Sequence, residues 1–138
     1  MGEATGRERS RFGVTPGQVV QEFGYDDDVD LALRQELETS VGSELVDEDF
    51  DDVTDAAIVW WREDDGDTSD LTDLVLDAMT TLDDGGLIWV LVPKPGRTGH
   101  VPPVEVEEAA ATAGLHGTST ISAAPDWTGL RLVARRGR

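Results

Sequence analysis

The sequence predicts an α/β fold: a three-layer sandwich whose mostly parallel sheet ends in an antiparallel C-terminal hairpin. Two continuous apolar runs, residues 56–61 and 87–92, lack the alternation of a half-exposed strand and are typical of parallel strands buried on both faces. A strongly amphipathic helical pattern lies between them. Two β-rich runs near the C-terminus, residues 118–123 and 130–134, are close enough in sequence to form a hairpin.

The first half of the chain supplies one strand and one helix. Residues 18–23 form a short β-rich run between a Pro-Gly turn and a glycine, which predicts a strand. Apolar residues then repeat every four positions from Val29 to Val41, which predicts a helix over about residues 27–40. Residues 44–55 carry few apolar side chains among many acids and are expected to be a loop or a weak edge strand.

The second half supplies two helices and the hairpin. Apolar residues at helical spacing between 71 and 82 predict a helix that Ser69 or Asp70 caps and that the glycine pair 85–86 ends, so the two buried strands form a right-handed crossover unit. Pro103 begins a second helix over about residues 103–113. Residues 124–129 are expected to connect the hairpin strands.

Length and composition limit the organisation and the function class. The chain has 138 residues and 38% hydrophobic side chains, which suits one domain, residues 12–138, after a disordered arm of residues 1–11. Acidic residues number 29 against 11 basic ones, a net charge of −18, which disfavours direct binding to duplex nucleic acid or to anionic membranes. The absence of cysteine excludes disulfides, thiolate zinc sites and a cysteine nucleophile.

No apolar run is long enough for a transmembrane helix, and no signal-like segment is present at the N-terminus. We therefore expect a cytoplasmic protein. No catalytic constellation emerges either: the two histidines, His100 and His116, are separated by a predicted helix, and Ser119 and Ser122 have no evident base. The chain is accordingly not expected to be an enzyme.

Two stretches resemble the class I S-adenosylmethionine-dependent methyltransferases. Residues 14–24 are similar to the family's first motif, in which a Pro-Gly turn launches a strand that ends in a glycine-rich loop, and residues 82–94 resemble its fifth strand. The resemblance implies a Rossmann-like methyltransferase fold. The fold would be truncated, because the chain is too short for the segment that the family places between its first and fourth strands.

The loop that binds the cofactor in that family is altered here. One glycine, Gly24, is kept, while Asp26 and Asp28 stand at the other two glycine positions. Their carboxylates would repel the methionyl carboxylate of the cofactor, which needs bare backbone N–H groups. Residues 61–63 also lack the Asn/Asp-Pro-Pro-aromatic motif of amino methyltransferases. We therefore expect no cofactor and no binding of S-adenosylmethionine.

Nearly the whole chain also resembles an uncharacterised actinobacterial family of small acidic proteins. Four segments carry this resemblance: GQVVQEFGYDDDVD, ELVDEDFDD, KPGRTGHV and DWTGLRLV. The family is one of unknown function, so the resemblance indicates relatives and implies no activity.

Candidate binding residues follow the predicted parallel strands, because loops at the carboxyl ends of such strands form the ligand edge of an open α/β sheet. Tyr25 follows the first strand, and Trp61 and Arg62 lie at the end of the second. The third is followed by three basic residues, Lys94, Arg97 and His100, in a loop with two glycines. These basic residues would hold a phosphate or an acidic segment, or else only neutralise neighbouring carboxylates.

Other residues admit two interpretations. The aspartates between 26 and 30 suit either a cation site or a helix N-terminus, and we favour the helix and expect no metal. The acids between 47 and 55 form a face for a basic partner, a nucleic-acid mimic or a solvated loop. Trp60 and Trp61 point to opposite faces of a strand and are expected in the core, whereas Trp127 lies in the predicted turn, exposed or in a dimer contact.

The sequence thus favours a non-catalytic binding or regulatory protein that acts through contacts with another protein, with a homodimer as a further option. The alternative is a sensor or small enzyme that binds a nucleotide or another phosphorylated metabolite at the crevice beyond the strand ends.

Overall fold

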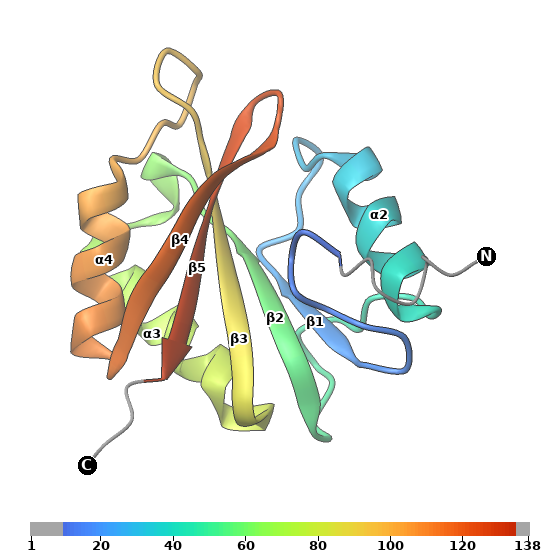
Figure 1. The fold of residues 1–138 in the computed structure, drawn as a ribbon. Helices are drawn as coiled ribbons and strands as arrows, with labels where there is room; N and C mark the ends of the chain where they lie inside the picture. The colour runs from blue at the N-terminus through green and yellow to red at the C-terminus, as the bar shows by residue number, and fades with distance from the viewer. Residues whose placement is uncertain (1–9, 135–138) are drawn as a thin grey trace.

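The computed structural model describes residues 10–134, which form one five-stranded sheet flanked by helices (Figure 1). The elements in chain order are β1 (Val20–Phe23), α2 (Leu31–Val41), β2 (Thr54–Trp60), a short 3-10 turn (Glu63–Asp65), α3 (Thr68–Thr81), β3 (Leu82–Pro93), α4 (Pro103–Thr112), β4 (Leu115–Ala124) and β5 (Trp127–Ala134). Among these residues no helix combines the length and apolar character needed to cross a membrane.

The sheet has the order β1-β2-β3-β5-β4. β1, β2 and β3 run parallel, with Ile58 of β2 opposite Trp89 of β3, and β5 pairs antiparallel with both β3 and β4. The predicted α/β class, the parallel strands and the antiparallel C-terminal hairpin are therefore confirmed. The parallel arrangement brings the carboxyl ends of β1, β2 and β3 to one edge of the sheet.

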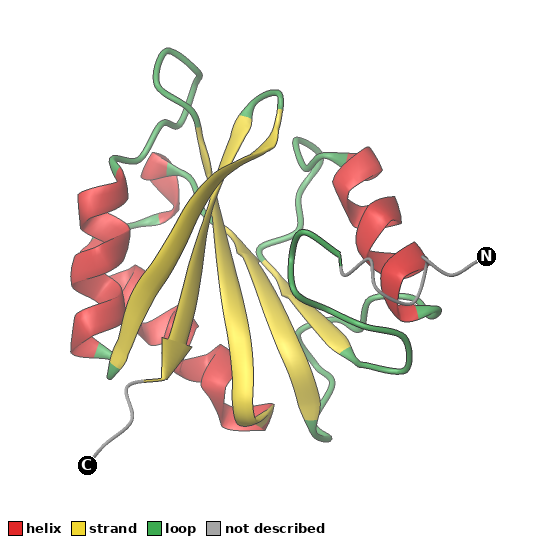
Figure 2. Cartoon of the chain, viewed as in Figure 1, coloured by secondary structure: helices red, strands yellow, loops and turns green. Residues whose placement is uncertain are grey.

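Helices cover both faces of the sheet (Figure 2). α2 and the segment that precedes β1 pack on one face, and α3 and α4 pack on the other. Trp60 belongs to the first of these cores and Trp61 to the second, with 0% and 6% of their surfaces exposed. Trp89 is also buried, and its indole N–H donates to the carbonyl of Phe12 at 2.8 Å. The predicted core positions of these tryptophans are confirmed.

The helix boundaries differ from the predicted ones at their polar ends. α2 begins at Leu31 because Asp30 is its cap and accepts from the backbone N–H of Leu33 at 2.8 Å, so residues 27–30 lie outside the helix. α3 begins earlier than predicted because Asp67, not Ser69 or Asp70, caps it. It ends at Thr81, and the glycine pair that was expected to stop it lies inside β3.

The connection from α2 to β2 covers the outer edge of β1. The backbone of Val46 donates to Val20 and accepts from Glu22, at 2.9 and 2.8 Å. The buried side-chain amide of Gln21 donates to the carbonyls of Asp47 and Phe50, both at 3.0 Å. Residues 44–53 are therefore a loop with a single bridge, the first of the two predicted options, and this loop protects an edge strand from pairing with another chain.

Two further segments differ from expectation. Most of the predicted disordered arm, residues 1–11, lies outside the described residues, but Arg11 is described and donates to Glu36 and to the carbonyls of Ser122 and Ala123. The hairpin connection is also tighter than residues 124–129, because β4 and β5 approach to within two residues of each other. Trp127 consequently lies in β5.

Trp127 is only 4% exposed, so the predicted exposed turn position or dimer contact is wrong. Its ring packs edge-to-face on Trp60, with 4.8 Å between the ring centroids. The short turn brings it over the core, because pairing with Pro93 of β3 and Ala124 of β4 continues as far as this residue.

Candidate functional site

A crevice lies where the loops after β1, β2 and β3 meet the β4–β5 turn. Its volume is about 500 Å³, and its lining includes six aspartates, two arginines, Trp127, Pro93, Thr98 and Gly99. The aspartates are Asp26, Asp27, Asp28, Asp64, Asp65 and Asp126, and the arginines are Arg62 and Arg97. This is the edge at which open parallel sheets bind their ligands.

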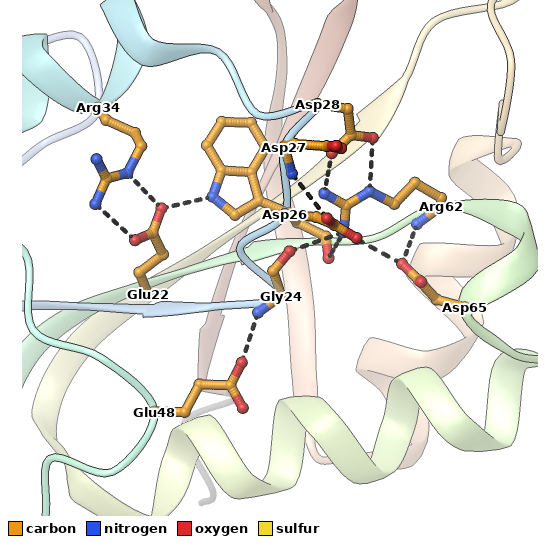
Figure 3. A network of polar contacts seen from close by, with 10 residues as sticks. Glu22, Gly24, Asp26, Asp27, Asp28, Arg34, Glu48, Arg62 and Asp65 are labelled. Carbon is orange, nitrogen blue, oxygen red and sulfur yellow. Dashed lines mark hydrogen bonds and ion pairs between the residues drawn. The ribbon is translucent and has the colours of Figure 1, made fainter.

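The side chain of Arg62 joins the walls of the crevice (Figure 3). One terminal N–H group donates to the carbonyls of Gly24 and Trp60, at 2.8 and 3.3 Å. The Nε–H donates to one carboxylate oxygen of Asp28 at 3.0 Å, and the second terminal nitrogen donates to the other oxygen. A weaker contact of 3.4 Å reaches Asp65. Only 9% of the Arg62 side chain is exposed.

The backbone around Arg62 explains its position. Residues 61 and 63 donate to the carbonyls of Leu91 and Gly99 at 2.8 and 2.9 Å, which ties the end of β2 to β3 and to the following loop. Gly99 leaves room for the arginine, since a Cβ there would lie 3.2 Å from the Cβ of Arg62. The guanidinium lies 5.4 Å from the ring of Trp127, within range of a cation–π contact.

The charges of this pair stabilise each other. The hydrogen bonds from Arg62 lower the pKa of Asp28 below its usual value, against a smaller opposing effect of burial. Burial acts to lower the pKa of Arg62, but the hydrogen bond and the charge of Asp28 outweigh it, so that pKa is raised. Both groups therefore stay ionised at neutral pH. The carboxylate of Asp28 already balances the charge of the guanidinium and accepts two of its hydrogen bonds.

Gly24 begins the loop after β1 and is held tightly. Its φ is +79°, and a Cβ at this position would lie 2.3 Å from the carbonyl oxygen of Trp60. Its N–H donates to the carboxylate of Glu48 at 2.9 Å, and its carbonyl accepts from Arg62. The glycine is therefore needed for the close approach of the loops after β1 and β2.

The aspartates after Gly24 do not begin a helix, so that prediction is wrong for residues 26–28. Asp30 alone caps α2, and Asp28 turns instead toward Arg62. Asp26 and Asp27 are exposed on the crevice wall. In the part of the chain that the structure describes, no group of three or more His, Asp or Glu side chains is arranged to hold a metal ion.

The predicted basic loop is only partly directed at the crevice. Arg97 lines it, but its Nε–H donates to Asp126 at 2.6 Å in an exposed ion pair. The ammonium of Lys94 donates to the hydroxyl of Ser122 at 2.6 Å, and a ring nitrogen of His100 lies 2.9 Å from the carbonyl of Pro93. The structure therefore does not bring these three side chains together at one anion site.

Tyr25 and Trp61 border a second, smaller pocket of about 270 Å³, which Arg62 also lines. Tyr25 is 57% exposed, and the Arg34 guanidinium lies 5.0 Å from its ring centroid. Trp61 presents little surface because it belongs to the core under α3. Of the six predicted binding residues, Arg62 and Arg97 share the main crevice, and Tyr25, Trp61 and Arg62 share the smaller pocket.

Sequence reasoning missed a buried polar network beside the crevice. Arg34 of α2 donates twice to Glu22 of β1, at 2.8 and 2.9 Å, and the indole N–H of Trp60 donates to the same carboxylate at 2.9 Å (Figure 3). Glu22 is 6% exposed. The available signal was its place in a predicted buried strand, because a buried carboxylate requires a charged or hydrogen-bonding partner.

A family model described as a protein of unknown function, DUF3052, matches residues 9–136. The chain belongs to the DUF3052 family. Uncharacterised proteins of Mycobacterium tuberculosis (strain H37Rv) and Mycobacterium bovis are 44% identical to it over 128 residues, which cover 93% of this chain and 78% of theirs. This DUF3052 chain therefore has actinobacterial relatives, as the sequence resemblance implied.

Solved structures show which fold this DUF3052 chain shares. The CcbJ methyltransferase from Streptomyces caelestis matches with a TM-score of 0.59 at 12% identity, over 98% of this chain and 97% of that one. The O-methyltransferase NcsB1 of neocarzinostatin biosynthesis, in complex with S-adenosylmethionine, matches with a TM-score of 0.59 at 14% identity. That match covers 86% of this chain, which spans about half of the NcsB1 chain, 49%. The chain thus has a Rossmann-like methyltransferase fold.

Proposed function

We propose that this chain is a non-catalytic binding protein whose crevice beyond the strand ends receives a basic segment of another protein. The observation that carries the proposal is the acidic lining of the crevice, in which six aspartates outnumber two arginines that are already paired, Arg62 with Asp28 and Arg97 with Asp126. The acidic walls of the crevice fit a partner segment that carries lysine or arginine side chains.

The Arg62 arrangement does not fit the methionyl end of S-adenosylmethionine. The carbonyl of Gly24 and the carboxylate of Asp28 are both occupied by the same guanidinium. Opening this space would leave the largely buried cation of Arg62 without its hydrogen-bond acceptors, and an unpaired buried charge is destabilising. Asp26 adds a further carboxylate in the position where the related fold needs bare backbone.

The charge of the crevice favours a cationic partner. Six aspartates face two arginines, and each arginine is already paired, Arg62 with Asp28 and Arg97 with Asp126. The remaining carboxylates attract lysine or arginine side chains and repel phosphate. A nucleotide or other phosphorylated metabolite, the alternative function, therefore has less support from these residues.

Cofactor binding is tested first, by isothermal titration calorimetry with S-adenosylmethionine and S-adenosylhomocysteine at about 1 mM. We expect no saturable heat from either compound. Saturable binding in the micromolar range would contradict the proposal, because it would require Arg62 and Asp28 to separate at little cost.

Partner binding is tested by affinity capture from the native cell with two charge-matched variants. One replaces crevice residues Asp26, Asp27 and Asp64 by asparagine, and the control makes the same change at Asp73, Asp77 and Asp83, which are exposed away from the crevice. A basic protein captured by the wild type and the control, but not by the crevice variant, supports the proposal. Equal capture by both variants would contradict it, because the acidic crevice would then have no part in binding.

A further inference from the structure

The sheet ends at β4, and on the outer side of β4 the described residues place no further strand (Figure 1). The opposite edge is different, since the loop around Val46 hydrogen-bonds to β1 and covers it. An uncovered edge presents backbone N–H and C=O groups that can pair with another strand. β4 is ten residues long, which gives such pairing an adequate length.

The side chains of β4 do not protect this edge. Residues 116–122 read His-Gly-Thr-Ser-Thr-Ile-Ser, without a lysine, an arginine, a carboxylate or a proline, and residues 116–120 are exposed. Natural edge strands usually carry such residues to prevent pairing. Their absence stands out in a chain with 29 acidic residues and a net charge of −18.

The C-terminal end of β4 is partly protected from pairing with another strand. Arg11 donates to the carbonyls of Ser122 and Ala123, at 3.1 and 2.6 Å, and the register with β5 shifts between residues 122 and 124. A second shift lies between Gly117 and Ser119. The open part of the edge is therefore residues 116–121, with a bulge at Thr118 that bends the strand without charging it.

We propose that this edge pairs with β4 of a second copy of the chain, in antiparallel register about a two-fold axis. The charge distribution favours a second copy. Two chains that each carry −18 repel one another over most of their surfaces, because residues 12–92 carry −21. β4 itself is uncharged, and residues 93–134, which contain it, carry only −1: Lys94, Arg97 and Arg131 against Glu105, Glu107, Glu108 and Asp126. Contact at β4 brings together the least negative parts of two copies, and the same patch serves both.

The oligomeric state tests this proposal through a matched pair of variants. Thr120→Lys places a charge on the edge, whereas Thr80→Lys makes the same change on the exposed side of α3. We expect the wild type and Thr80→Lys to form dimers in light-scattering chromatography as the concentration rises toward about 1 mM, and Thr120→Lys to remain monomeric. Both variants lower the net negative charge equally. A difference in dimerisation between them is therefore caused by the charge on the β4 edge and not by a change in overall repulsion.

A cross-linking measurement supplies a second test that does not depend on the lysine variant. The chain has no cysteine, so Thr118→Cys introduces one thiol near the proposed two-fold axis and Thr80→Cys one far from it. Facing residues in an antiparallel pair are close enough for a disulfide. Mild oxidation is expected to give a disulfide-linked dimer of Thr118→Cys at least about tenfold faster than of Thr80→Cys.

Three results would overturn the proposal. The first is a wild type that stays monomeric at every concentration, and the second is a Thr120→Lys variant that dimerises as well as the wild type. The third is a monomer whose β4 amides become protected from hydrogen exchange only in cell extract, which would assign the edge to a strand of another protein. None of these results bears on the crevice, so the proposed function is tested separately.

Discussion

The guanidinium of Arg62 and the carboxylate of Asp28, 34 residues apart in the chain, form a two-pronged ion pair that joins the loops after β1 and β2. The arginine is almost fully buried, whereas 49% of the aspartate side chain is exposed. The pair therefore links the two loops in the wall of the crevice, while its aspartate remains in contact with solvent. Four measurable consequences follow from this geometry and from the residues that surround it.

Arg62→Gln is expected to destabilise the protein by about 3 kcal/mol, because it leaves the carbonyls of Gly24 and Trp60 and the carboxylate of Asp28 without their donor. Urea unfolding followed by tryptophan fluorescence measures the change. Arg97→Gln is the control, since its ion pair with Asp126 is exposed and contributes at most about 1 kcal/mol. Equal losses in both variants would show that Arg62 is not a bridge between the loops.

Asp28 is expected to make stability depend on pH in the acid range. Its pKa is lower in the folded protein than its ordinary value of 3.8, because Arg62 hydrogen-bonds to the ionised form. A lowered folded pKa stabilises the fold above the unfolded pKa, and this contribution disappears as pH falls through the folded value. The free energy of unfolding between about pH 5 and pH 2 should therefore fall less steeply in Asp28→Asn than in the wild type.

Asp27→Asn is the control for this experiment, because Asp27 is in the same loop and Arg62 directs its ion pairs to Asp28 and Asp65 instead. It should follow the wild-type curve. An Asp28→Asn curve parallel to that of the wild type would remove Asp28 as the source of the pH dependence.

Gly24→Ala is expected to cost about 2–4 kcal/mol, since it combines a positive φ with a Cβ 2.3 Å from the carbonyl oxygen of Trp60. Gly96→Ala separates these two effects. Its φ of +84° is similar, but a Cβ there meets nothing within 4 Å, so the expected cost is about 1–2 kcal/mol. Similar thermal unfolding of both variants would contradict the close approach of the loops after β1 and β2.

Trp127→Ala is expected to destabilise the protein by about 3–5 kcal/mol, because it empties a buried position against the ring of Trp60. Tyr25→Ala removes another aromatic ring near the crevice, but that ring is exposed and makes only a cation–π contact with Arg34, so a loss of about 1 kcal/mol or less is expected. Denaturant titration compares them. A Trp127→Ala variant as stable as the wild type would place this side chain outside the core.

The buried strands could be predicted from the sequence more accurately than the ends of the helices. The buried strands were predictable because Ile58 and Trp89 belong to apolar runs long enough to require burial on both faces. The ends of the helices were less predictable, since Asp67, Ser69 and Asp70 are all chemically suited to cap α3. Only the backbone conformation decides which carboxylate reaches the free N–H groups.

The sequence by itself determined the fold class and the location of the sheet edge at which the parallel strands end, because both depend on local apolar patterns and on the order of strands and helices. Only the tertiary structure decided which side chains meet at that edge, namely Arg62 and Asp28. Asp28 follows a short strand and suited a helix start equally well, and it meets Arg62 only because β1 and β2 lie side by side. Contacts between residues 34 positions apart depend on the packing of the whole sheet, and no local pattern encodes them.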